Sequence, residues 1–169
     1  ESVNIYKLPK LKTGIGELDK FLCGGIPFGI VCLVSGKRGD GKSTFASQLM
    51  AQAVEQGYQT FAYSGELPNY MYKSWFDFQV AGPSHIIEND NYGIINRSIS
   101  NANQSAINEW YREKALIYDS RIIENDEKED LLGCVEKVIM QHGAKVILID
   151  NLMTAMYIDE VRSDDKYDM

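Results

Sequence analysis

A glycine-rich run in the first third of the chain carries the residues with the clearest chemical potential. It fits the pattern G-x-x-x-x-G-K-[ST] and consists of Gly36, Lys37, Arg38, Gly39, Asp40, Gly41, Lys42, Ser43 and Thr44. This pattern forms a loop whose backbone N–H groups cradle phosphates, and glycine lets the chain curl closely around them because it lacks a β-carbon. The Lys42 ammonium group would stabilise charge between the β- and γ-phosphates, and the Ser43 hydroxyl would bind Mg²⁺. The run therefore predicts a site for ATP and Mg²⁺, with Lys42 as a catalytic residue.

The residues on either side of this run predict the elements that must hold it. The apolar run 30–34, which contains Cys32, predicts a buried strand. The spacing of apolar residues from Phe45 to Val54 predicts a helix that ends at Gly57. Strand, loop and helix in this order are the context in which the pattern binds phosphate, and the helix would add the positive end of its dipole. The alternative is a glycine-rich turn before an ordinary helix, in which case the match to the phosphate-binding pattern is accidental.

A second candidate side chain is the carboxylate of Asp150, which ends the apolar run 146–149. Ligand sites in open α/β sheets lie at the carboxyl ends of the strands, where the phosphate-binding loop also lies. We therefore expect Asp150 to hold Mg²⁺, directly or through water, opposite Ser43. The alternative is an acidic residue that merely ends a strand.

Hydrolysis of ATP also requires a group that orients or deprotonates the attacking water. Many ATPases with this loop place a glutamate directly after the metal-binding aspartate, but here that residue is Asn151. Glu66 is the candidate catalytic base, because it follows the predicted strand 59–63 at the same edge of the sheet and Gly65 permits a tight turn before it. The alternative is a glutamate that complements the dipole of a helix beginning at Pro68.

The pattern of the whole chain predicts an α/β fold with a parallel sheet flanked by helices. Apolar strands alternate with helical segments, and continuous apolar strands are typical of a sheet that is covered on both faces. Further elements are predicted as a strand at 115–119 and helices at 68–81, 104–114 and 127–142, with a loop-rich connection over 83–103. The length of 169 residues, 44% of them hydrophobic, corresponds to one domain. We expect residues 1–12 to be a lead-in segment and residues 13–169 to form the ATPase domain.

Composition and charge exclude several classes of protein. The net charge is −7 without a basic stripe, whereas free-standing nucleic-acid-binding proteins are usually basic, so any contact with nucleic acid must be local or lie outside this chain. No apolar run approaches the roughly 18 residues of a membrane span, and the first residues lack the features of a signal peptide. The three cysteines lack the spacing of a metal site, which favours a reducing compartment. We therefore expect no membrane partner and a cytoplasmic location.

Aromatic residues are concentrated in the predicted helix 68–81, as Tyr70, Tyr72, Trp75, Phe76 and Phe78. Packing against the sheet is the favoured interpretation of this group. Stacking on nucleic-acid bases and cover for a subunit contact are the alternatives.

In its combination of motifs, the chain resembles the ATPase core of the DnaB-type hexameric replicative DNA helicases, including the phage primase-helicases and the mitochondrial Twinkle group. The segments that carry the resemblance are 13–19, 24–29, 64–67 and 149–152, and the similarity covers about residues 10–169. The resemblance implies a RecA-like P-loop NTPase that couples ATP hydrolysis to translocation on single-stranded DNA and to duplex unwinding. It also implies a homo-oligomeric ring, a hexamer in that family, in the cytoplasm of bacteria or phage-infected cells or in mitochondria.

The resemblance also implies parts that this chain lacks. In that family a polar sensor, DNA-contacting loops and an arginine finger follow the second metal-binding motif, so we expect the domain to be incomplete at Met169 and weakly active by itself. Arg38 departs from the small residues often found at its position, and it would either steady a phosphate or point into solvent. Two other assignments stay open, namely a RecA- or RadA-type recombinase ATPase and a KaiC-like regulatory ATPase without unwinding activity.

Overall fold

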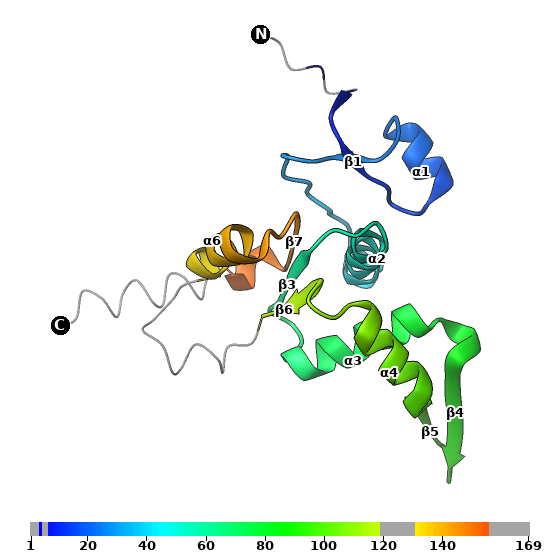
Figure 1. Cartoon of the computed structure of the whole chain (residues 1–169). Helices are drawn as coiled ribbons and strands as arrows, with labels where there is room; N and C mark the ends of the chain where they lie inside the picture. The colour runs from blue at the N-terminus through cyan, green and yellow to red at the C-terminus, as the bar shows by residue number, and fades with distance from the viewer. Residues whose placement is uncertain (1–3, 5–6, 119–130, 156–169) are drawn as a thin grey trace, which may run out of the picture.

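A three-stranded parallel sheet lies at the centre of the computed structural model, which describes residue 4 and residues 7–118 and 131–155 (Figure 1). The middle strand is β3 (Thr60–Ser64), with β6 (Ala115–Ile117) on one side and β7 (Val146–Asp150) on the other. Thr60 pairs with Val146 at one end of the β3–β7 ladder, and Ser64 pairs with Asp150 at the other. Because these strands are parallel, the residues that follow β3 and β7 leave the sheet at the same edge.

Helices cover both faces of this sheet, as predicted. They are α2 (Lys42–Glu55), α3 (Asn69–Ala81), which a 3₁₀ turn at η2 (Pro83–His85) follows, α4 (Asn101–Trp110) and α6 (Leu131–His142). Side chains alternate between the faces of a strand, and β3 divides its own accordingly. Ala62 packs in a core with residues of α2, α3 and α4, whereas Phe61 and Tyr63 pack with Leu131 and Val138 of α6 on the opposite face (Figure 1). The α/β fold with a parallel sheet flanked by helices is thereby confirmed.

The apolar run 30–34 does not form the strand that its residues predict. Residues 31–37 belong to no helix or strand, and Val31 and Leu33 are 97% and 81% exposed. Cys32, which we expected inside a buried strand, is exposed as well. The physical reason is that a strand exists only through hydrogen bonds to a neighbour, and β-branched composition does not select that neighbour. In the described sheet β7 pairs only with β3, so the segment before the phosphate-binding loop remains outside the sheet.

The region predicted as a loop-rich connection contains a β-hairpin instead. Its strands are β4 (Ile86–Asn91) and β5 (Ile94–Ile99), which pair antiparallel and project beyond α3 and α4 (Figure 1). Tyr92 and Gly93 both have positive φ angles, of 55° and 82°, as a two-residue type I′ turn requires. The prediction was wrong because Asn and Asp are depleted in strands, whereas here a local turn aligns two polar segments. The Asp90 carboxylate supports that turn by accepting the Gly93 N–H at 2.7 Å.

A small N-terminal unit precedes the central sheet. It consists of β1 (Lys10–Leu11), α1 (Gly16–Phe21) and β2 (Ile26–Pro27), with β1 and β2 paired antiparallel. The Gln56 side chain joins this unit to the end of α2, because it accepts the Lys12 N–H at 3.0 Å and donates to the Lys12 carbonyl at 2.9 Å. Within the unit, the Thr13 backbone and hydroxyl both donate to the Asp19 carboxylate, and these hydrogen bonds lower the pKa of Asp19.

A buried carboxylate joins α3 to α4. Asp77 is 4% exposed, and its oxygens accept hydrogen bonds from Lys73 Nζ (2.8 Å), Gln104 Nε2 (2.7 Å) and the Tyr111 hydroxyl (2.8 Å). A buried charge is tolerated when it is paired and fully hydrogen-bonded, and this one has three donors. The network therefore fixes how α4 packs on the helix that follows Glu66.

Replacing Asp77 by alanine is expected to lower the free energy of unfolding of this chain by about 2–4 kcal/mol, because it leaves three donors without their charged acceptor. Urea denaturation measures the loss. The matched control is Glu109→Ala, which breaks an ion pair with Arg112 in which both side chains are 67% exposed. That change is expected to cost less than about 1 kcal/mol. Equal losses for the two variants would contradict the assignment of Asp77 as the joint between the helices.

Candidate nucleotide-binding site

The glycine-rich loop leads directly into α2, as its sequence predicts. Gly41 is the N-cap residue and has a φ of +82°, a left-handed conformation that glycine adopts without steric cost. No side chain caps this helix, and no acidic residue lies in its first turn. The first N–H groups of α2 are therefore not occupied by a capping side chain, and such groups at a helix N-terminus can bind an anionic ligand.

The Lys42 ammonium group lies inside the curve of the loop. Its Nζ atom donates to the carbonyl oxygens of Gly36 (3.0 Å) and Lys37 (2.7 Å). The Lys37 N–H donates in turn to the Asp40 carboxylate at 2.7 Å, so that the loop is closed by its own polar groups. Phosphate oxygens are stronger acceptors for an ammonium group than neutral carbonyls are, because both partners are then charged. The Lys42 ammonium group is therefore placed to exchange its contacts with carbonyl oxygens for contacts with phosphate oxygens.

The second part of the site lies where β3 and β7 end. The Gly65 N–H donates to the Asp150 carbonyl at 2.6 Å, which extends the pairing of the two strands by one residue. Glu66 follows immediately and is exposed, and its Oε1 atom accepts a hydrogen bond from Asn151 Nδ2 at 3.2 Å. The structure thus brings Glu66 to Asn151, the residue that follows Asp150, and the Asp150 side chain is half-buried.

A buried tyrosine connects α3 with α2 close to this edge. The Tyr72 hydroxyl lies 3.2 Å from the Ser47 hydroxyl and donates to the Met50 sulfur at 3.7 Å. Burial raises the pKa of Tyr72 to about 12, and the negative charge of Asp150 adds to the increase while the hydrogen bond with Ser47 opposes it. The end of β7 therefore lies within electrostatic reach of the contact between these two helices.

The residues named as a nucleotide and metal site fall into two sets. The first is the continuous loop 36–44, and the second is Glu66 with Asp150. α2 packs against β7, but within the described residues no hydrogen bond or ion pair joins the Ser43 side chain to Asp150. Arg38 is exposed on the loop, and its side chain makes no such contact with the described residues either. A hydroxyl and a carboxylate are the hard oxygen ligands that Mg²⁺ prefers, so the chemistry of this pair fits the metal.

In the sequence Asn151 stands out as a departure from other ATPases and as part of the segment 149–152 that resembles the helicases, whereas Thr154 does not stand out. In the structure the Asn151 Oδ1 atom accepts the N–H of Thr154 at 3.0 Å and its hydroxyl at 2.8 Å, at the start of a helical turn over 152–155. The signal in the sequence was an asparagine placed where a helix N-cap belongs, three residues before a threonine.

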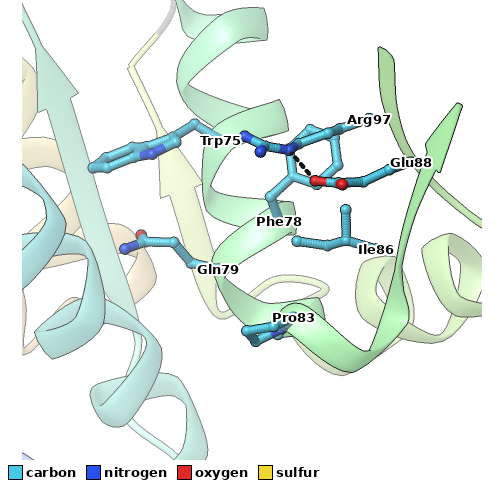
Figure 2. A pocket seen from close by; sticks show the side chains of 8 residues that line it. Trp75, Phe78, Gln79, Pro83, Ile86, Glu88 and Arg97 are labelled. Atoms are coloured by element: carbon cyan, nitrogen blue, oxygen red, sulfur yellow. Dashed lines mark hydrogen bonds and ion pairs between the residues drawn. The ribbon is translucent and has the colours of Figure 1, made fainter. Parts of the chain in front are cut away.

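Most aromatic residues of α3 lie in the core or line a separate cavity, whereas Tyr70 is exposed. Tyr72 and Phe76 are buried in the core beside α2 and α4, which agrees with the favoured interpretation of packing. Trp75 and Phe78 instead line a pocket of about 520 Å³ between α3 and the hairpin (Figure 2). Across that pocket, Arg97 of β5 forms an exposed ion pair with Glu88 of β4 at 2.8 Å (Figure 2).

The part of the chain that the structure describes contains neither a cluster of metal-ligating side chains nor a helix suited to a membrane. His, Cys, Asp and Glu side chains form no group of three or more there that would hold a metal ion by themselves. None of the helices there has both the length and the apolar character required to cross a membrane.

Comparisons with known proteins show which sequences this chain is similar to. A family profile described as "ATPase: KaiC" matches residues 11–163. The UPF0273 protein MJ1359 of Methanocaldococcus jannaschii is 32% identical over 163 residues, which cover 90% of this chain and 60% of that protein. The DNA repair protein RadA of Salmonella typhimurium is 37% identical over 54 residues, which cover 32% of this chain and 12% of that protein.

The circadian clock protein KaiC3 of Synechocystis sp. is 38% identical over 50 residues, which cover 30% of this chain and 10% of that protein. The chain therefore spans less than two thirds of the length of each of these relatives. No solved structure matches it.

The family profile confirms the predicted superfamily, because it covers most of the chain, the phosphate-binding loop included. The DnaB-type helicases do not figure in these findings, so that narrower assignment stays a prediction. The chain, with its RecA-like P-loop fold, belongs to the KaiC family of ATPases.

Proposed function

We propose that this chain binds ATP with Mg²⁺ and hydrolyses the bond between the β- and γ-phosphates. The observation that carries the proposal is the pairing of Ser64 with Asp150, after which Glu66 contacts Asn151, the residue next to Asp150, at the edge of the sheet. A metal-binding carboxylate and a base must lie close together for hydrolysis, because both act on the same phosphoryl group. Membership of an ATPase family supports the same reaction.

In this proposal each residue has one task. The loop N–H groups and the Lys42 ammonium group bind the phosphates and stabilise the charge that develops on them. Ser43 and Asp150 would hold Mg²⁺, which would neutralise phosphate charge when bound. Glu66 orients the attacking water and accepts its proton. Its exposure at the end of β3 leaves room for water to approach the carboxylate.

Removal of Mg²⁺ tests this assignment. We expect ATP hydrolysis by the full-length protein to fall about 100-fold or more when EDTA is added and to recover with excess Mg²⁺. Asp150→Asn is expected to raise the Mg²⁺ concentration required for half-maximal turnover, because an amide is a weaker ligand than a carboxylate. The control is Asp90→Asn in the hairpin turn, which is expected to leave that concentration unchanged. Turnover that is insensitive to both EDTA and Asp150→Asn would refute the proposed metal site.

We also propose that the full-length protein acts as a ring of identical subunits and couples this ATPase to single-stranded DNA. Similarity to RadA, a DNA repair protein, over about a third of the chain supports a role on DNA, whereas similarity to KaiC3, a clock protein, supports a regulatory role without unwinding. Strand displacement on forked DNA distinguishes the two. ATP-dependent displacement would support a helicase, and stimulation of ATPase by DNA without displacement would support a recombinase. Turnover that ignores DNA would favour a regulatory ATPase.

A further inference from the structure

One contact at the ends of β3 and β7 has no role in the function proposed above, namely the hydrogen bond from Asn151 to Glu66. Asn151 is half-buried, and its carboxamide makes three hydrogen bonds. At one end Nδ2 donates to Glu66 Oε1 at 3.2 Å. At the other end Oδ1 accepts both the N–H and the hydroxyl of Thr154, at 3.0 and 2.8 Å.

The contacts with Thr154 determine which end of the amide faces Glu66. A carboxamide has one acceptor oxygen and one donor nitrogen, and a backbone N–H can only donate. Because the Thr154 N–H points at Asn151, the oxygen must lie on that side and the NH₂ group must lie on the side of Glu66. An aspartate at position 151 would still accept from Thr154, but it would present a second carboxylate to Glu66 instead of a donor.

Close packing holds the two segments in this arrangement. A β-carbon on Gly65 would lie 2.5–2.9 Å from side-chain atoms of Thr154, so only glycine lets the turn before Glu66 approach this closely. On the other side of Glu66, the Leu67 N–H donates to the Ser64 hydroxyl at 3.1 Å. The backbone on both sides of Glu66 is thus fixed, and Asn151 fixes one oxygen of its carboxylate.

We propose that Asn151 is a positioning residue for the catalytic base, with Thr154 as its support. It holds Glu66 Oε1 by a hydrogen bond and leaves Oε2 to accept a proton from water. This inference rests on the proposed function, since it assigns Asn151 a role only if Glu66 is the base. Misplacement of a catalytic group by about 1 Å can cost on the order of 100-fold in rate, so one hydrogen bond at this position matters.

Steady-state ATPase kinetics of the full-length protein test the proposal through the variants Asn151→Ala and Asn151→Asp. Both are expected to lower kcat about 10- to 100-fold and to leave KM for ATP within about two-fold, because the phosphate-binding loop is untouched. Asn151→Asp keeps the acceptor for Thr154, so it preserves the fold where alanine destabilises it. Asn89→Asp, the same chemical change on the exposed strand β4, is the matched control and is expected to leave kcat unchanged.

A double-mutant cycle with Glu66→Gln separates this inference from the proposed function. If Asn151 acts through Glu66, Asn151→Asp is expected to have little further effect on kcat in the Glu66→Gln background. Full turnover by Glu66→Gln alone would refute the base assignment itself. Low turnover by Glu66→Gln together with wild-type or higher turnover by Asn151→Asp would overturn only the positioning role, as would a fall in kcat that persists undiminished in the double variant.

Discussion

Replacing Lys42 by alanine is expected to weaken ATP binding about 100-fold and to lower turnover about 100- to 1,000-fold. The side chain would provide charge-assisted hydrogen bonds to phosphate, and two such bonds contribute about 3 kcal/mol or more. The loss in turnover is larger than the loss in binding, since charge on the phosphoryl group is greatest in the transition state. Titration with a fluorescent ATP analogue measures the binding, and phosphate release measures the turnover.

The matched control for this experiment is Lys37→Ala on the same loop. Lys37 is exposed, and its backbone N–H and carbonyl make hydrogen bonds within the loop that alanine retains. We therefore expect this variant to bind ATP within about three-fold of the unaltered chain. Comparable losses for the two lysines would mean that the loop attracts phosphate by net charge alone. Tight binding of ATP by the Lys42 variant would mean that the loop is not the phosphate-binding site.

Glu66→Gln is expected to leave ATP binding within about two-fold and to reduce turnover about 100- to 10,000-fold. Glutamine occupies the same space as glutamate but cannot accept a proton from water, and general-base catalysis contributes factors of this size. Single-turnover measurements with saturating protein isolate the chemical step from product release. Retained binding with lost turnover is the pattern that assigns Glu66 to chemistry.

Glu136→Gln provides the control for the loss of one negative charge. Glu136 is an exposed residue of α6, which covers the face of the sheet opposite to α2. It is expected to leave both binding and turnover unchanged. If Glu66→Gln hydrolyses ATP as fast as Glu136→Gln does, the base lies elsewhere. A large loss of binding in Glu66→Gln would instead point to a role in holding the nucleotide.

The sequence predicted elements well where one segment determines its own structure. The helix after the glycine-rich loop was expected to end at Gly57 and spans Lys42–Glu55, and the strand that carries Asp150 lies where it was predicted. A helix forms through bonds within its own segment, so its local pattern carries its structure. The apolar run 146–149 forms a strand because it also has a partner in β3.

Prediction failed where structure depends on a partner elsewhere in the chain. The run 30–34 has the composition of a strand but remains outside the described sheet. A strand also requires a neighbouring strand with free hydrogen-bonding groups, and composition does not provide one. The hairpin strands β4 and β5 have unfavourable composition but pair through the turn at Tyr92 and Gly93. Both errors arise because strand formation is a property of two segments at once.

The sequence by itself determined which chemistry the phosphate-binding loop offers, because the glycines, Lys42 and the start of α2 lie within nine consecutive residues. It also indicated that Glu66 and Asp150 share an edge of the sheet, since parallel strands end together. Only the tertiary structure decided that Glu66 meets Asn151, 85 residues further along the chain. That contact depends on the register of β3 with β7, and on the hydrogen bond from the Thr154 N–H that turns the NH₂ group of Asn151 toward Glu66. These are relations in space that no local pattern of residues encodes.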